Sequence, residues 1–91
     1  MAIVRIPSPM RQYTEGERAV SVEGRTLAQA LEHLVTRYPA LQPRLFERDG
    51  EVHPFVNIFV DGGDVRLGDG LSTAMREDSE IAVIPAMAGG Y

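Results

Sequence analysis

One segment of this 91-residue chain has the spacing of apolar residues that predicts a long helix, and the rest of the chain has to fold around it. Thr26 can cap the N-terminus of this helix, and Gln29 would complete a capping box. The apolar residues that follow share one stripe: Leu27, Leu31, Leu34, Val35 and Tyr38. Pro39 ends the pattern. The sequence therefore predicts a single amphipathic helix with one apolar face.

Short runs of β-branched and aromatic residues on both sides of this helix predict strands. These runs lie at 4–6, 19–22, 55–60 and 81–84, with a shorter candidate at 65–67. Pro7 and Pro85 would end the first and last of them, and a loop at 8–17 would make the first two a hairpin. One helix can cover one face of a four- or five-stranded mixed sheet, so we predict an α+β domain in two layers. The β-grasp, or ubiquitin-like, fold has this order of elements.

Strand parity predicts which side chains meet the helix, because alternate residues of a strand point to opposite faces of a sheet. Val56, Ile58 and Val60 are all aliphatic and are therefore expected to face the helix. The predicted core is Val4, Ile6, Val20, Leu27, Leu31, Leu34, Val56, Ile58, Val60, Ile81 and Val83. An irregular turn at 40–46 is expected to cover the edge of this core.

The same parity predicts an apolar patch on the opposite face of the sheet. Phe55 and Phe59 should point away from the helix, and we expect them beside Ala82 and Ile84 of the last strand. An exposed apolar patch is a candidate docking face for partner proteins. The alternative is that the loop at 40–52 covers these rings.

Composition excludes several kinds of site. The chain has no cysteine, which rules out disulfides, thiolate metal sites and a cysteine nucleophile. Nine basic and 13 acidic residues give a net charge of −4, which argues against a nucleic-acid partner. No window is apolar enough for a membrane span, and the first residues do not have the pattern of a signal peptide. We therefore expect a cytoplasmic protein without a membrane partner.

The residue types that usually carry catalysis are not grouped in a catalytic pattern. His33 and His53 do not stand at a metal-ligand spacing, and no serine lies in a G-x-S-x-G context. The acidic groups at 47–51 and 77–80 are typical of solvated turns. A domain of this size can hardly enclose a cleft between paired carboxylates. We therefore expect no enzymatic activity, no catalytic residue, no bound metal and no cofactor.

The C-terminal residues have a pattern of their own. After the last strand come two alanines with Met87 between them, of which the second is Ala88, and then Gly89 and Gly90. Glycine has no Cβ, so such a tail can thread a narrow channel and bring a terminal carbonyl close to a partner's backbone and to ATP. A frayed, glycine-rich end without a role is the alternative. We predict a folded domain at 1–86 and a flexible tail at 87–91.

The segment Asp78–Gly90 resembles the C-terminal signature of the ThiS/MoaD sulfur-carrier family, which is an acidic turn, an apolar strand, a proline, small residues and a Gly-Gly end. Phe55–Val60, with the following Asp61–Arg66, is most similar to the CysO type of carrier. The resemblance covers most of the chain and implies the same β-grasp fold.

The resemblance also implies a function and partners. In this family an E1-like adenylating enzyme activates the carboxylate of the final glycine, here Gly90. A sulfur donor then displaces AMP and leaves a thiocarboxylate, which delivers sulfur to an acceptor enzyme such as a PLP-dependent cysteine synthase or another synthase. The carrier itself is a substrate of these partners, which supply the catalysis.

The chain departs from the family pattern at Tyr91, which follows Gly90. With Tyr91 attached, the Gly90 carbonyl is an amide and offers no carboxylate for adenylation. The resemblance implies a precursor that a JAMM-type zinc protease trims between these two residues. The alternatives are that Tyr91 is an added terminal residue, or that the chain is a homologue that has lost carrier activity. A ubiquitin-like modifier that is conjugated to target lysines, and a binding module with an idle tail, are the alternative functions.

Overall fold

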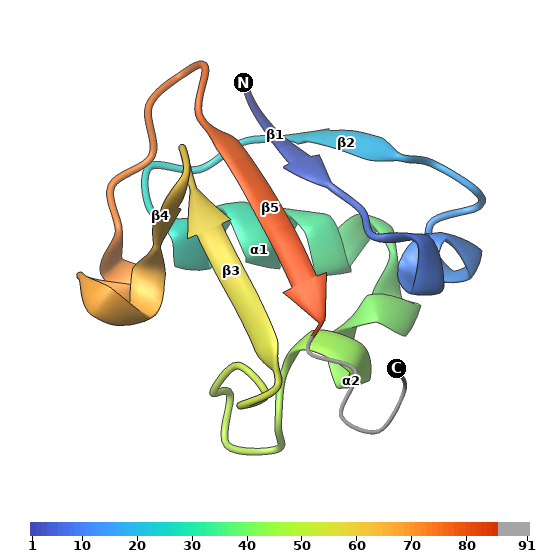
Figure 1. Cartoon of the computed structure of the whole chain (residues 1–91). Coiled ribbons are helices and arrows are strands. Elements are labelled where there is room, and N and C mark those ends of the chain that lie inside the picture. The colour runs from blue at the N-terminus through green and yellow to red at the C-terminus, as the bar shows by residue number, and fades with distance from the viewer. Residues whose placement is uncertain (86–91) are drawn as a thin grey trace.

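The computed structural model describes residues 1–85, which form two layers (Figure 1). The strands are β1 (Ala2–Arg5), β2 (Ala19–Val22), β3 (Val56–Val60), β4 (Gly63–Asp64) and β5 (Glu80–Pro85). The α-helices are α1 (Leu27–Arg37) and α2 (Gln42–Leu45), and the 3₁₀ helices are η1 (Ser8–Tyr13), η2 (Pro39–Leu41), η3 (Val65–Leu67) and η4 (Gly70–Ser72). No helix in this part of the chain is long and apolar enough to cross a membrane.

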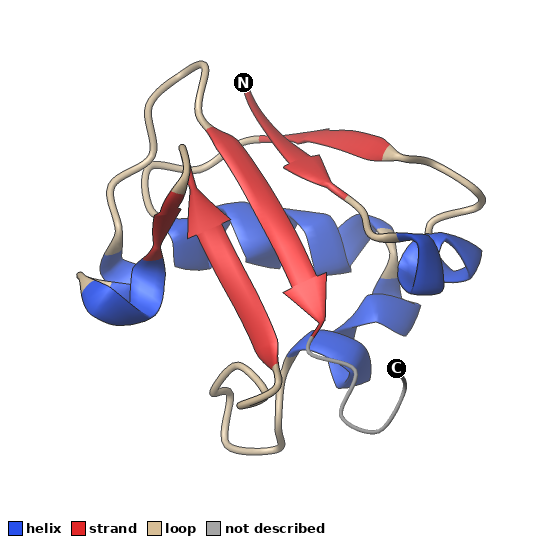
Figure 2. Ribbon diagram, in the orientation of Figure 1, coloured by secondary structure: helices blue, strands red, loops and turns tan. Residues whose placement is uncertain are grey.

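The strands form one mixed sheet in the order β2-β1-β5-β3-β4. β1 and β5, from the two ends of the described chain, pair in parallel at the middle of the sheet, and the other neighbours are antiparallel. α1 lies across one face of the sheet (Figure 2). This is the β-grasp arrangement, so the predicted fold class is confirmed.

Local capping fixes the start of α1. The Thr26 hydroxyl accepts the backbone N–H of Gln29 at 3.3 Å, as the capping box predicts. The Gln29 side chain reaches past Thr26 and accepts the N–H of Arg25 at 2.8 Å. Leu27, Leu31 and Leu34 of the predicted stripe are buried, whereas Val35 and Tyr38 are half-buried at its margin. Ala30, which the sequence analysis did not include, completes the buried face.

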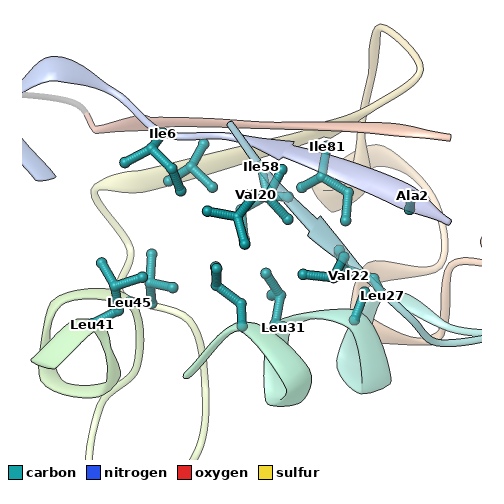
Figure 3. Packing of buried hydrophobic residues seen from close by; sticks show 14 of the residues in the cluster. Ala2, Ile6, Val20, Val22, Leu27, Leu31, Leu41, Leu45, Ile58 and Ile81 are labelled. Atoms are coloured by element: carbon teal, nitrogen blue, oxygen red, sulfur yellow. The ribbon is translucent and has the colours of Figure 1, made fainter. Parts of the chain in front are cut away.

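The core lies between α1 and the sheet (Figure 3). Every predicted core residue is buried except Val60, which is half-buried at the end of β3. The additional buried apolar residues are Ala2, Met10, Val22, Ala30, Leu41 and Leu45. Leu41 and Leu45 come from the irregular turn expected at 40–46, which is ordered as η2 and α2. They close the core at the end of the sheet where β5 finishes.

The predicted strand at 65–67 is wrong, because these residues form η3. The turn after β3 is made by Asp61 and Gly62, both with positive φ (50° and 88°), and it returns the chain as the two-residue strand β4. The Asp64 carboxylate then accepts the N–H of Arg66 at 2.9 Å, which caps η3 and takes the chain off the sheet. Pro85 does not end the pairing of the last strand, since it is still in register with Val56.

Candidate functional site

The outer face of the sheet, which is turned away from α1, gathers three of the predicted interface residues. In the antiparallel ladder of β3 and β5, Phe59 pairs with Ala82, and Asn57 pairs with Ile84. Paired residues of neighbouring strands place their side chains on the same face. Phe59 and Ala82 are half-buried, whereas the Ile84 side chain is 49% exposed. The structure therefore brings these residues together as one apolar patch, and their role in docking stays a prediction.

β1 adds two residues to this face that sequence analysis missed. The parallel register places Ile3 opposite Glu80 and Arg5 opposite Ala82, and Ile3 is partly exposed. The Arg5 guanidinium lies 3.2 Å from the Glu80 carboxylate, so an exposed ion pair borders the apolar patch. The alternation of Ala2 and Val4 with Ile3 and Arg5 was a usable signal, but only the tertiary pairing of β1 with β5 puts Ile3 beside the patch.

Phe55 occupies a separate position at the end of the sheet. It precedes β3, its side chain is 53% exposed, and it lines a shallow groove. The residues around this groove are Pro9, Met10, Tyr13, Arg44, Phe55, Val56 and Pro85. Most of these side chains are apolar, and Arg44 is the one cation among them. The Arg44 guanidinium lies 4.7 Å from the centroid of the Tyr13 ring. The alternative that the loop at 40–52 covers the predicted patch is wrong for Phe55.

The groove lies at the point where the described chain ends. Pro85 is the last described residue and lines the groove together with Phe55. The predicted tail residues, Met87, Ala88, Gly89, Gly90 and Tyr91, lie outside the described residues. Their assignment to activation and processing is therefore still a prediction. The structure shows that the chain enters this segment beside the groove and close to the apolar patch.

The opposite end of β5 is held by a carboxylate. Asp61 accepts the backbone N–H of Glu80 at 2.9 Å and a guanidinium N–H of Arg76 at 3.3 Å. The Glu80 N–H has the largest effect and lowers the pKa of Asp61. Desolvation comes next and opposes it, and hydrogen bonds from Ser79 and Arg76 lower the pKa further. This carboxylate fixes where β5 begins relative to β3 and so helps to set the register of the outer face.

The two histidines hold backbone segments in place. Nδ1 of His33 accepts the N–H of Glu23 at 2.7 Å and so ties α1 to the end of β2. Nε2 of His53 lies 3.0 Å from the carbonyl oxygen of Pro43, and its ring stacks on that of Phe55. Among residues 1–85, no group of three or more histidine and acidic side chains is placed to hold a metal ion.

Comparison with known proteins gives a consistent result. The model of the ThiS family matches residues 4–90. The sulfur carrier protein CysO of Mycobacterium tuberculosis is 38% identical over 89 residues, which are 96% of each chain. One chain of the crystal structure of the Amycolatopsis orientalis BexX/CysO complex superposes with a TM-score of 0.91 at 30% identity, and the match covers 99% of this chain and 100% of that one. The small archaeal modifier protein SAMP1 of Haloferax volcanii superposes with a TM-score of 0.80 at 29% identity over 98% of both chains.

Proposed function

The chain belongs to the ThiS family, and on that premise we propose that it is a sulfur carrier activated at Gly90. The observation that carries this proposal is the family match, which extends through Gly89 and Gly90 to the end of the Gly-Gly motif. The CysO relative supports it, because its similarity extends over 96% of both chains.

The proposed chemistry takes place at one carboxylate. An oxygen of the Gly90 carboxylate attacks the α-phosphorus of ATP, and pyrophosphate leaves. A sulfide donor then attacks the Gly90 carbonyl carbon, the bond to AMP breaks, and a thiocarboxylate remains. Its sulfur is a nucleophile for an electrophilic acceptor, such as the PLP-bound aminoacrylate of a cysteine synthase. In this scheme the chain is not an enzyme, because an E1-like protein and the acceptor enzyme supply the catalysis.

The residue after Gly90 decides whether this chemistry can start. In the chain with Tyr91, the Gly90 carbonyl belongs to a peptide bond and has no carboxylate oxygen to attack ATP. A JAMM-type zinc protease would remove Tyr91, because its metal-bound water can attack that carbonyl at neutral pH. The intact chain is therefore the precursor in this proposal, and the 1–90 form is the carrier.

The outer face is the proposed docking surface for these partners. Its apolar patch (Phe59, Ala82 and Ile84) and the groove with Phe55 adjoin the end of β5, from which the chain continues to Gly90. A partner that covers this surface would hold the C-terminal segment at its own active site. The complex of a CysO protein with BexX shows that a relative of this fold associates with another protein.

A protein modifier is the second candidate function, and the similarity to SAMP1 favours it. A modifier shares the adenylation step, but its activated carbonyl is attacked by a lysine amine of a target protein. The two functions therefore differ only in the nucleophile and leave different products. A thiocarboxylate on the free chain indicates the carrier, whereas isopeptide-linked remnants on other proteins indicate the modifier.

The experiment compares the 1–90 and 1–91 forms, each incubated with the E1-like enzyme of the same organism, ATP and sulfide. Intact mass spectrometry should show replacement of one oxygen by sulfur on 1–90 alone. A 1–88 form without Gly89 and Gly90 is the matched negative control. The same mass gain on the 1–91 form would show that Tyr91 is itself activated and would end the precursor proposal. No gain on either form would contradict the carrier function.

A further inference from the structure

The Phe55 side chain is exposed, yet a neighbouring ring restricts it. Its ring stacks on His53 with a centroid separation of 5.2 Å and an interplanar angle of 9°. The His53 ring is held in turn by the carbonyl of Pro43 in α2, 3.0 Å from Nε2. An exposed aromatic side chain usually keeps several rotamers. The stack on His53 therefore restricts the rotamers of Phe55, which would otherwise be free to change.

The backbone that carries Phe55 is not fixed by the sheet. The ladder begins only at Val56, whose partner Pro85 has no N–H to donate. The preceding residues, 53–55, are outside any strand and are closed by a turn in which the Val56 N–H reaches the His53 carbonyl at 3.0 Å. The neighbouring carbonyls of Pro54 and Val56 are held instead by a side chain.

The side chain of Arg66 holds them. Its Nη2 atom donates to the carbonyl oxygen of Val56 at 2.7 Å and to that of Pro54, and it lies 3.4 Å from that of His53. The backbone of Arg66 is anchored by the Asp64 carboxylate at 2.9 Å. Hydrogen bonds from a charged donor are stronger than neutral ones, and one planar guanidinium can serve several acceptors. Arg66 therefore links η3 to the carbonyls on both sides of Phe55.

We infer that Arg66 is a positioning residue for docking of the E1-like enzyme: it acts through Phe55, whose ring it keeps in the orientation that this enzyme contacts. This inference rests on the proposed function, in which the groove beside Pro85 lies in the docking surface. A side chain that is already immobilised loses less conformational entropy when the partner binds, and this entropy loss would otherwise weaken binding. Arg66 therefore raises affinity without needing to touch the partner.

A double-mutant cycle with the E1-like enzyme of the same organism tests this inference. Arg66→Met keeps the length of the side chain and removes the guanidinium. It should weaken binding about tenfold in the unsubstituted chain and less than about twofold in a Phe55→Ala background. Arg25→Met removes the same charge from an exposed residue elsewhere and should leave affinity unchanged. Equal losses in both backgrounds, or no loss in the first, would overturn the inference.

A second measurement needs no partner and separates this inference from the proposed function. In the free chain, ring-current shifts of the Phe55 and His53 ring protons report their stack by NMR. These shifts should collapse in Arg66→Met, with the core methyl signals unchanged. A preserved stack would overturn the inference even if binding falls, and Arg66→Gln replaces Arg66→Met if the latter does not fold. If the unsubstituted chain does not bind the enzyme, the proposed docking fails, while the NMR result still decides the role of Arg66.

Discussion

The Asp61 carboxylate accepts the backbone N–H of Glu80 at 2.9 Å and so joins the turn after β3 to the first residue of β5. Asp61 can occupy that turn because its positive φ (50°) is one that aspartate and asparagine tolerate better than most residues. The same residue thus shapes the hairpin and positions the strand that leads to the C-terminal segment. The hydrogen bonds that Asp61 accepts lower the pKa of its carboxyl group.

We expect the contribution of Asp61 to stability to depend on pH. The pKa of Asp61 is lower in the folded chain than in the unfolded chain. The ionised carboxylate therefore stabilises the fold fully at a pH above the pKa that Asp61 has when the chain is unfolded. This stabilisation is lost as the pH falls below about 4, through the pKa that Asp61 has in the folded chain. At pH 7, Asp61→Asn should lower the free energy of unfolding by about 1 kcal/mol, allowing for the partly exposed side chain. Denaturant unfolding at pH 7 and at about pH 3 gives the free energy of unfolding of the unsubstituted chain and of Asp61→Asn. A difference between the two proteins that is the same at both pH values would contradict this expectation.

Leu31→Ala should cost about 2–5 kcal/mol of unfolding free energy, because Leu31 is fully buried between α1 and the sheet. Leu67→Ala removes the same atoms from a side chain that is 89% exposed, and its effect should stay within about 0.5 kcal/mol. Denaturant unfolding compares the two variants directly. A loss below about 1 kcal/mol for Leu31→Ala would place this residue outside the core.

Gly24→Ala should destabilise the fold by about 1–3 kcal/mol. A Cβ at position 24 would lie 2.6 Å from the backbone nitrogen of Ala30 and 2.9 Å from the carbonyl carbon of Gln29, so the start of α1 would have to move. Gly63→Ala is the matched control, because its Cβ would meet only the Val60 carbonyl oxygen at 3.6 Å. Thermal unfolding should give a lower melting temperature for Gly24→Ala than for Gly63→Ala. Equal melting temperatures would show that the backbone before α1 shifts to accept the added Cβ without a loss of stability.

Ile84→Asp should weaken binding to the E1-like enzyme by about 2 kcal/mol or more, since it places a charge in the centre of the proposed docking face. Ile84 is half exposed, so the fold should survive, and circular dichroism checks this. Ala28→Asp introduces the same charge on an exposed position of α1, in the other layer, and should not change the affinity. Unchanged binding by Ile84→Asp would move the docking face elsewhere.

Elements whose pattern repeats along the chain could be predicted from the sequence. The stripe through Leu27, Leu31 and Leu34 specifies α1, and the alternation of Val56 and Ile58 specifies the inner face of β3, because both periods follow from backbone geometry alone. The segment at 65–67 misled the prediction for a related reason. Its apolar residues suit a strand, but the Asp64 side chain competes for the backbone N–H of Arg66 and starts a 3₁₀ turn.

The sequence by itself determined the helix, the aliphatic strands and the C-terminal Gly89-Gly90 motif, since each is encoded by residues that are neighbours in the chain. Only the tertiary structure decided that Ile3 lies beside the outer patch and that Arg66 holds the carbonyls around Phe55. Ile3 lies in β1, which pairs with a strand from the other end of the chain, and Arg66 reaches carbonyls ten or more residues away. Such contacts form when the burial of the common core brings distant segments together, and no local pattern records which segments will meet.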